Sequence, residues 1–137
     1  MPIEFSDIEA ELVSYLSTAL EVRVATRVPN PRPTTWLQIR RSGGGAFLNR
    51  APLASVFRDF ALVDVWAWSD TETAASDLMM RARGLLVGMP IAQPLSSSVY
   101  SVDEFSGPQW DDTADPGMPV TPRMWATYEI ATRVRMT

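Results

Sequence analysis

The segment from Phe57 to Ser69, FRDFALVDVWAWS, limits more than any other how this chain can fold. Two acidic residues, Asp59 and Asp64, interrupt an otherwise mostly apolar run. Both sides of its alternating pattern are apolar, with Phe60, Leu62, Trp66 and Trp68 on one side and Phe57, Ala61, Val63, Val65 and Ala67 on the other. Strands of this kind are typical of the interior of a sheet. We therefore expect a central strand that is covered on both faces.

Two other segments carry apolar residues at helical spacing. The first begins with a capping-box pattern at 6–9, and we expect its helix to run from about Asp7 to Leu20. The second begins with the same pattern at 69–72 and ends near the glycine and proline of 88–90. Each helix has one apolar face, so both are expected to cover the core.

Further strands are predicted from alternation and from β-branched and aromatic residues, at 22–28, 34–41, 96–105 and 123–136. The resulting order of elements favours an α+β fold, with a mostly antiparallel sheet of four to five strands and two helices packed on one face. The length of 137 residues suits a single domain, 1–137. Glycine, proline and acidic residues predict mobile loops at about 42–56 and 107–122.

The chain has no histidine, cysteine or lysine, and arginine supplies all 12 of its basic side chains. This composition removes the usual proton shuttles, nucleophiles and transition-metal ligands. Asp111, Asp112 and Asp115 form the one carboxylate cluster suited to a hard cation, but they lack the ligand spacing of an EF-hand loop. We expect a solvated acidic loop there. No catalytic, cofactor-binding or metal-binding residue is assigned, and the chain is not expected to be an enzyme.

A hydrolase is the enzymatic alternative, because paired carboxylates can act as acid and base. Its candidates are Asp59, Asp64 and the pair Asp103 and Glu104. On strands such carboxylates are more often paired with arginines, such as Arg58 here. The net charge of −4 also argues against nonspecific binding to a phosphate backbone. We therefore favour a surface that binds other proteins.

Tryptophan and arginine are the residue types most enriched at protein interfaces. Gly43 to Gly45 indicates the hinge of a docking arm, with an ordinary surface hairpin as the alternative. Trp110 and Trp125 have no obvious internal partner, and the three aspartates are expected to meet Arg133 and Arg135 of a neighbouring subunit. The candidate contact residues are Arg40, Arg41, Phe47, Leu48, Arg50, Trp110, Asp111, Asp112, Asp115, Arg123, Trp125, Arg133 and Arg135.

Most of the chain resembles the tail terminator, or tail completion, proteins of long-tailed bacteriophages. The resemblance rests on the N-terminal helix, the strand before the proline-rich connector, TTWLQIRRSGG, and VFRDFALVDVWAWSDTETAASDLMMRARGLLVGM. Its most telling part is the strand ending V-D-V-W-A-W-S-D, followed by an alanine-rich helix. This is a pattern of residue types and not a catalytic signature. The arginine-rich, lysine-free composition, which a GC-rich coding sequence also explains, fits a phage of an actinobacterial host.

The resemblance implies a structural virion protein that forms a homohexameric ring at the head-proximal end of the tail tube. Such a ring stops tube polymerisation and joins the tail to the head. Its partners would be copies of itself, the tail tube protein and a head-side connector or stopper protein, and DNA would pass through it without specific binding. Another head–tail connector component or the tube subunit remains open. Neither a signal sequence nor a membrane-spanning run is seen, so synthesis in the host cytoplasm and no membrane partner are expected.

Overall fold

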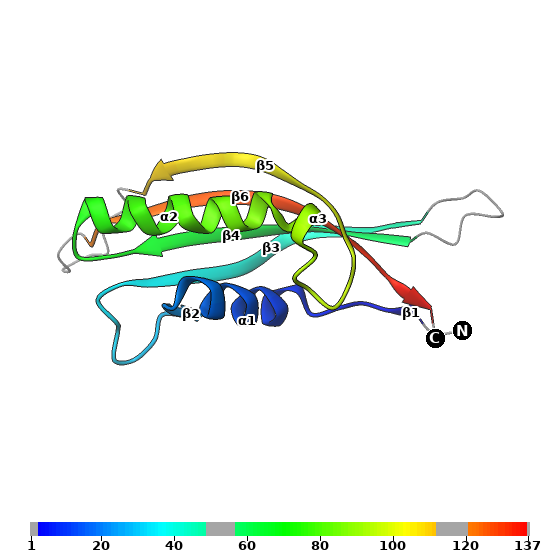
Figure 1. The fold of residues 1–137 in the computed structure, drawn as a ribbon, viewed down its shortest axis with the longest axis horizontal. Helices are drawn as coiled ribbons and strands as arrows, with labels where there is room; N and C mark the ends of the chain where they lie inside the picture. Colours follow the sequence, from blue (N-terminus) through cyan, green and yellow to red (C-terminus); the bar gives the residue numbers. More distant parts are fainter. Residues whose placement is uncertain (1–2, 49–56, 112–120, 137) are drawn as a thin grey trace.

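The computed structural model describes residues 3–48, 57–111 and 121–136. These residues form an α+β fold, as expected from the sequence (Figure 1). In chain order the elements are β1 (Ile3–Glu4), α1 (Ile8–Leu20), β2 (Arg23–Ala25), β3 (Trp36–Leu48), β4 (Phe57–Trp68), α2 (Glu72–Val87), α3 (Met89–Ala92), β5 (Val99–Trp110), β6 (Arg123–Arg133) and β7 (Arg135–Met136).

Five of the strands form the main sheet, in the order β2-β3-β4-β6-β5. β2 pairs with β3 in parallel, and the other neighbours are antiparallel. β4 therefore lies in the middle of the sheet, as its sequence predicts. A second, two-stranded sheet joins β1 to β7 and brings the two ends of the chain side by side (Figure 1).

The two long helices lie on one face of the sheet. α1 contacts β2 and β3, whereas α2 contacts β4, β6 and β5 and runs along them (Figure 1). Their buried residues meet every second residue of each strand, so one continuous apolar core forms between the two layers. On the sheet side this core includes Leu37, Ile39, Ala61, Val63, Val65, Ala67, Met124, Ala126, Tyr128 and Ile130.

Both helices begin one or two residues away from the predicted capping residues. Asp7, and not Ser6, caps α1, because its carboxylate accepts a hydrogen bond from the backbone N–H of Ala10 at 3.2 Å. Thr71, and not Ser69, caps α2 in the same way. Several residues that can cap a helix stand side by side at both starts, and the sequence alone does not rank them.

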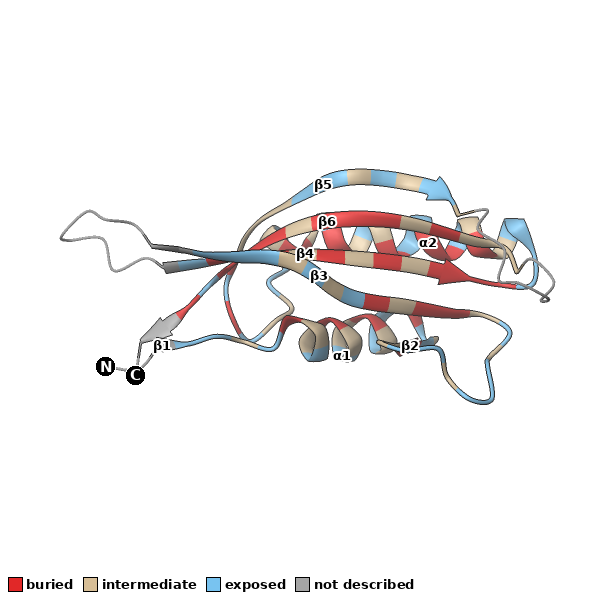
Figure 2. Ribbon diagram, turned by 180° about the vertical axis from the view of Figure 1, so that it is seen from behind, coloured by how far each residue is buried: buried red, intermediate tan, exposed pale blue. Residues whose placement is uncertain are grey.

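The other face of the sheet has no helix on it among the described residues. Seen from behind, β5, β6, β4 and β3 lie in front of α2, with no described element covering them (Figure 2). The expectation that β4 is covered on both faces is therefore wrong for its middle part, whereas Trp68 at its end is buried on this side too. Phe60, Leu62 and Trp66 point to this uncovered side and are only half-buried, whereas Ala61, Val63 and Val65 on the helix side are fully buried.

The predicted loops are shorter than expected. Residues 42–48 continue β3, with Gly43, Gly44 and Gly45 opposite Leu62, Ala61 and Phe60 of β4, so the glycines are part of a hairpin and not a hinge. Gly44 has a φ of 91°, and a Cβ there would lie 1.8 Å from the carbonyl oxygen of Phe60, which only glycine avoids. Residues 107–110 likewise belong to β5. The remaining loop residues, 49–56 and 112–120, lie outside the described residues.

Candidate interaction surface

The uncovered side of the sheet, called the open face below, is built from residues that the strand register places next to one another. It consists of Trp36, Gln38 and Arg40 of β3, Arg58, Phe60, Leu62, Asp64, Trp66 and Trp68 of β4, Arg123, Trp125, Thr127, Glu129, Ala131 and Arg133 of β6, and Ser101, Asp103, Ser106 and Gln109 of β5. Of its four tryptophans, Trp36 and Trp68 are buried at one end, whereas Trp66 and Trp125 are only half-buried, and half-buried tryptophans are unusual on a face in contact with water.

At one end of the open face, two tryptophans and an arginine form a ladder across the strands. The rings of Trp36 and Trp68 are stacked, with centroids 5.4 Å apart. The guanidinium group of Arg123 lies 4.6 Å from the centre of the Trp68 ring, and its Nε donates to Asp111 at 3.0 Å. Both tryptophans are buried, so this end of the open face is packed within the chain. Asp111 is therefore paired with Arg123 of its own chain, and its contact with a neighbouring subunit stays a prediction.

In the middle of the open face, Trp66 of β4 lies opposite Trp125 of β6, and both are half-buried. The next pair along the same strands is Asp64 and Thr127, whose hydroxyl donates to the Asp64 carboxylate at 2.6 Å. Leu62 follows, and it is also half-buried. These residues give the middle of the face an apolar ridge with single polar groups beside it.

Several charged groups of the open face have no ion-pair or hydrogen-bond partner among the described residues. Arg40 is exposed although the register places it opposite Asp64, and Glu129 lies opposite Asp103, so two carboxylates stand side by side. Charges that are unpaired within the chain can be matched by opposite charges of a partner.

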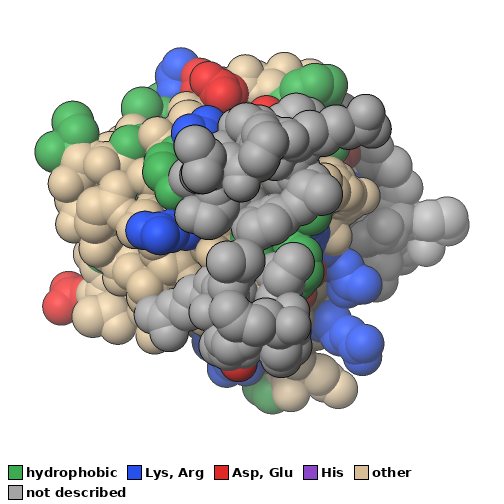
Figure 3. Space-filling model, turned by 90° about the vertical axis from the view of Figure 1, so that its right-hand side faces the viewer, with side chains coloured by type: hydrophobic (Ala, Val, Ile, Leu, Met, Phe, Trp, Pro, Cys, Tyr) green, Lys and Arg blue, Asp and Glu red, His purple; other side chains and the backbone are tan. Residues whose placement is uncertain are grey.

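Toward the β3–β4 hairpin the open face ends in arginines. Arg58 and Arg133 are opposite each other in the register, and both are exposed. The guanidinium group of Arg58 lies 4.4 Å from the centre of the Tyr100 ring. Arginine side chains are visible at several separate places when the molecule is seen from this end (Figure 3). The open face is thus acidic in its middle and basic at its hairpin end.

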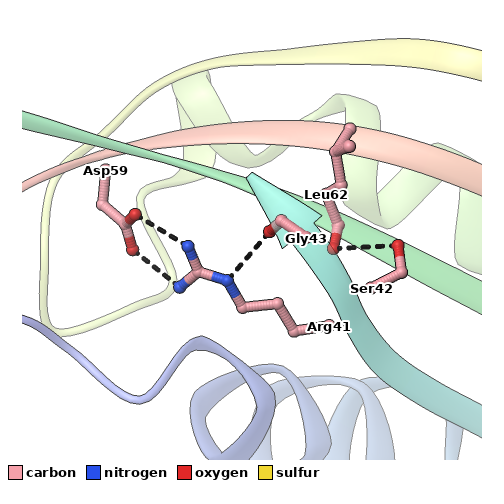
Figure 4. Close-up of polar contacts among 5 residues, drawn as sticks. All are labelled: Arg41, Ser42, Gly43, Asp59 and Leu62. Atoms are coloured by element: carbon pink, nitrogen blue, oxygen red, sulfur yellow. Dashed lines mark hydrogen bonds and ion pairs between the residues drawn. The ribbon is translucent and has the colours of Figure 1, made fainter. Parts of the chain in front are cut away.

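Arg41, which was predicted as a contact residue, is instead part of the fold. Its side chain points to the helix side, where it donates from Nη1 and Nη2 to the two carboxylate oxygens of Asp59 at 2.9 and 2.8 Å and from Nε to the Gly43 carbonyl (Figure 4). The hydrogen bond to Asp59 raises the pKa of Arg41 above its ordinary value. Glu9 of α1 accepts from the Arg41 backbone N–H at 2.7 Å. This cluster fixes the base of the hairpin against α1.

A second polar cluster joins α2 to the sheet. Arg83 donates to both carboxylate oxygens of Glu104, at 2.6 and 3.0 Å, and the Tyr128 hydroxyl donates to the same carboxylate at 3.1 Å. Burial raises the pKa of the Tyr128 phenol, and the neighbouring Glu104 carboxylate raises it further. Glu104 and Asp59, two of the possible hydrolase carboxylates, are therefore held by arginines in structural roles.

The remaining predicted contact residues are spread over the molecule. Trp110 lies at the end of β5 on the helix side, where it lines a hollow of about 390 Å³ with Met80, Glu72 and Asp77 of α2. The backbone of Phe47 and Leu48 belongs to β3, and that of Arg135 to β7. Arg50, Asp112 and Asp115 lie outside the described residues. Of the predicted set, the open face brings together Arg40, Arg123, Trp125 and Arg133.

Sequence reasoning missed the β4 half of the open face, because it placed Phe60, Leu62 and Trp66 in a core. One signal was present: Asp64 has the same parity in the strand as these residues, and a core seldom accepts an unpaired carboxylate. The face around Asp64 was therefore the candidate for solvent or a partner.

No group of three or more acidic side chains that could hold a metal ion occurs in the described residues. None of the helices described here is both long enough and apolar enough to cross a membrane. Neither a protein-family profile nor a curated protein sequence matches this chain.

Proposed function

We propose that this chain is a structural protein of a long-tailed phage, a tail terminator whose copies form a ring at the head-proximal end of the tail tube. In that position the ring ends tube polymerisation and presents a surface to the head-side connector. The observation that carries an assembly role is the open face, with its half-buried Trp66, Trp125 and Leu62 and its unpaired charges. The tail location and the ring rest on the sequence resemblance.

The β5 edge of the sheet supports contact through a face of the sheet and not through an added strand. At one edge, β2 has only three residues and pairs only with residues 36–38 of β3, so residues 39–48 of β3 have no described strand on that side. The other edge strand, β5, has three breaks in its register, contains Pro108, and exposes Asp103 and Phe105. Short edge strands, bulges, proline and charges all hinder pairing with another strand. Strand addition at the β5 edge is therefore disfavoured, and the open face is the larger contact surface.

The proposal includes no catalytic residue. Asp59 is paired with Arg41, Glu104 with Arg83, and Asp64 accepts a hydrogen bond from Thr127. Each of these carboxylates has a structural use that a general acid or base would have to give up. We therefore place binding, and not hydrolysis, at the centre of the function.

The test combines genetics and solution mass. A phage that lacks this chain is expected to produce overlong tails without heads, and the purified chain is expected to be a monomer or a closed ring across concentration. Normal tails with no attached heads would instead indicate a head-side joining protein. Open tubes of the purified chain would indicate the tube subunit.

A further inference from the structure

The outer edge of β3 is unpaired over its second half in the part of the chain that the structure describes. β2 pairs with residues 36–38 only, and the Glu9 carboxylate accepts a hydrogen bond from the Arg41 backbone N–H at 2.7 Å. Beyond Arg41, no described strand lies beside residues 43–48, which continue past both long helices (Figures 1 and 2). We call the outer side of residues 43–48 the free edge.

The free edge has none of the features that keep strand edges from pairing. Its residues, GGGAFL, include no charged side chain and no proline, and they pair with β4 in one unbroken register. β5, at the opposite edge of the sheet, has three breaks in its register and contains Pro108. Native sheets normally protect a long edge with such features. An edge that lacks them is suited to an added strand, which its backbone N–H and C=O groups recognise.

Gly45 is a residue of the free edge for which the single chain does not need glycine. Glycine inside a strand weakens it and often marks a site where another backbone or a ligand approaches closely. A Cβ at Gly45 would meet no atom within 4 Å, and its φ is outside the left-handed region. Gly44 differs, because its φ is 91° and it lies against the Phe60 carbonyl. The chain therefore requires glycine at position 44 but not at position 45.

The glycines of the free edge also leave room on the open face. Gly43 and Gly45 lie opposite Leu62 and Phe60 of β4 and share the open face with them. Because Gly43 has no side chain, the half-buried Leu62 has no β3 side chain directly opposite it. A strand added to the free edge lies two strand spacings, about 10 Å, from β4, and large side chains can meet across a glycine over that distance. The added strand is therefore expected to carry large apolar residues at alternate positions.

We propose that the free edge receives an extended strand of the tail tube protein, whose large apolar side chains pack over Gly43 and Gly45 beside Leu62. This contact rests on the proposed function, which places the chain at the end of the tube. The occupant is another protein and not a second copy, because two copies joined through the same edge form a two-fold dimer, which the proposed ring does not contain. Of the other edge strands, β2 is too short and β5 too irregular to supply the added strand.

Backbone hydrogen exchange tests the pairing, measured for the chain alone and for the chain bound to tail tubes that were made without it. Amides on the free edge should exchange more slowly on the tubes, by about tenfold or more, whereas amides on the outer side of β5 should not change. Unchanged exchange on the free edge of the bound chain would overturn the contact and leave the proposed function standing. Slowing that grows with concentration in the absence of tubes would place a second copy on the free edge and would also overturn it.

Gly45→Trp and Gly45→Ala give an independent test, with Gly84→Trp as the matched control. Gly84 is another exposed glycine, but it lies on α2. All three variants are expected to fold, since a Cβ at either glycine meets no atom within 4 Å. Gly45→Trp should weaken binding to tail tubes by about tenfold or more, because its ring fills the space of the partner's side chain. Gly45→Ala should weaken binding less, and Gly84→Trp should bind like the wild type. Equal binding of Gly45→Trp and the wild type would show that the free edge is not used.

The wild type in the same experiments separates this contact from the proposed function. A wild-type chain that binds no tail tubes would overturn the contact. If tails made without the chain also have normal length, the proposed function is wrong as well.

Discussion

The two faces of the central sheet come from the same strands but differ in chemistry. On the helix side β4 offers the small aliphatic residues Val63 and Val65, and both are fully buried. On the open face the same strand offers Leu62, Asp64 and Trp66, all half-buried. Strand alternation places one set on each side. The comparison shows that large aromatic residues in a sheet do not by themselves mark the core of a chain.

The chemical difference follows from what each face meets. A helix packs closely on a sheet when the side chains beneath it are short, because the two backbones then come near each other. At an interface with another protein, large side chains that also carry a polar group, such as tryptophan and arginine, are favoured. They bury a large area and still tolerate water when the partner is absent. We therefore expect the helix side to contribute most to the stability of the single chain, and we propose that the open face determines what it joins.

The largest expected effect is the difference in unfolding free energy lost when a leucine is replaced by alanine on each face of the sheet. Leu37 is fully buried on the helix side, whereas Leu62 of the neighbouring strand is half-buried on the open face. Leu37→Ala should lower the free energy of unfolding by about 2–5 kcal/mol, because it leaves a cavity in the core. Leu62→Ala should lower it by about 1 kcal/mol or less. Urea unfolding of dilute protein measures both, and equal losses would mean that the faces do not differ as described.

A smaller loss is expected from the cluster that holds the hairpin to α1. Arg41→Met leaves Asp59, whose side chain is 5% exposed, without its partner. Because the Arg41 side chain is itself 30% exposed, we expect a loss of about 2–3 kcal/mol in the free energy of unfolding. The double variant with Asp59→Leu should regain part of this loss. If the double variant is the sum of its single variants, the two side chains are not coupled.

For a substitution on the open face, we expect a small loss of stability and a larger loss of assembly. Trp125→Gln removes a half-buried ring whose cross-strand neighbour is Trp66. The free energy of unfolding of the single chain should fall by about 1 kcal/mol, the usual value of a cross-strand pair. Assembly, followed by sedimentation velocity across concentration, should weaken much more than stability does. A variant that unfolds easily but assembles normally would assign Trp125 to the fold.

The smallest effect concerns alkaline pH. The pKa of Tyr128 is raised in the folded chain, so the folded state favours the protonated phenol. The stability that this group contributes is present below its unfolded pKa of about 10 and is lost as the pH rises above that value. The difference in unfolding free energy between the wild type and Tyr128→Phe should therefore shrink between pH about 8 and pH about 11. A difference that is independent of pH would contradict the role of burial.

The fold was largely predictable, because periodicity identifies elements that pack on a core. α1, the central position of β4 and the core side of β6 all follow from apolar spacing. The extent of β3 did not follow, because Gly43 to Gly45 suggest a loop and only pairing with β4 makes them a strand. Long-range pairing of this kind leaves no local signal in the sequence.

The interaction surface was predictable only in part. Arg40 was singled out because it flanks the three glycines, and Trp125 and Arg133 because tryptophan and arginine stand out on a polar strand side; the structure places all three on the open face. Trp66 was not found, because an apolar side chain has the same pattern whether its own chain or a partner covers it. Arg41 was assigned to a surface, because its ion pair with Asp59 depends on the register of the hairpin.

The most direct test of the central claim, that the open face is an assembly surface, is the solution mass of the wild type and of Leu62→Arg measured in parallel, with and without tail tubes that lack this chain. The wild type is predicted to associate, as a ring or on the tubes. Leu62→Arg is predicted to remain a folded monomer, because its charge lies on the ridge that must be covered. Equal association of both proteins would contradict the claim.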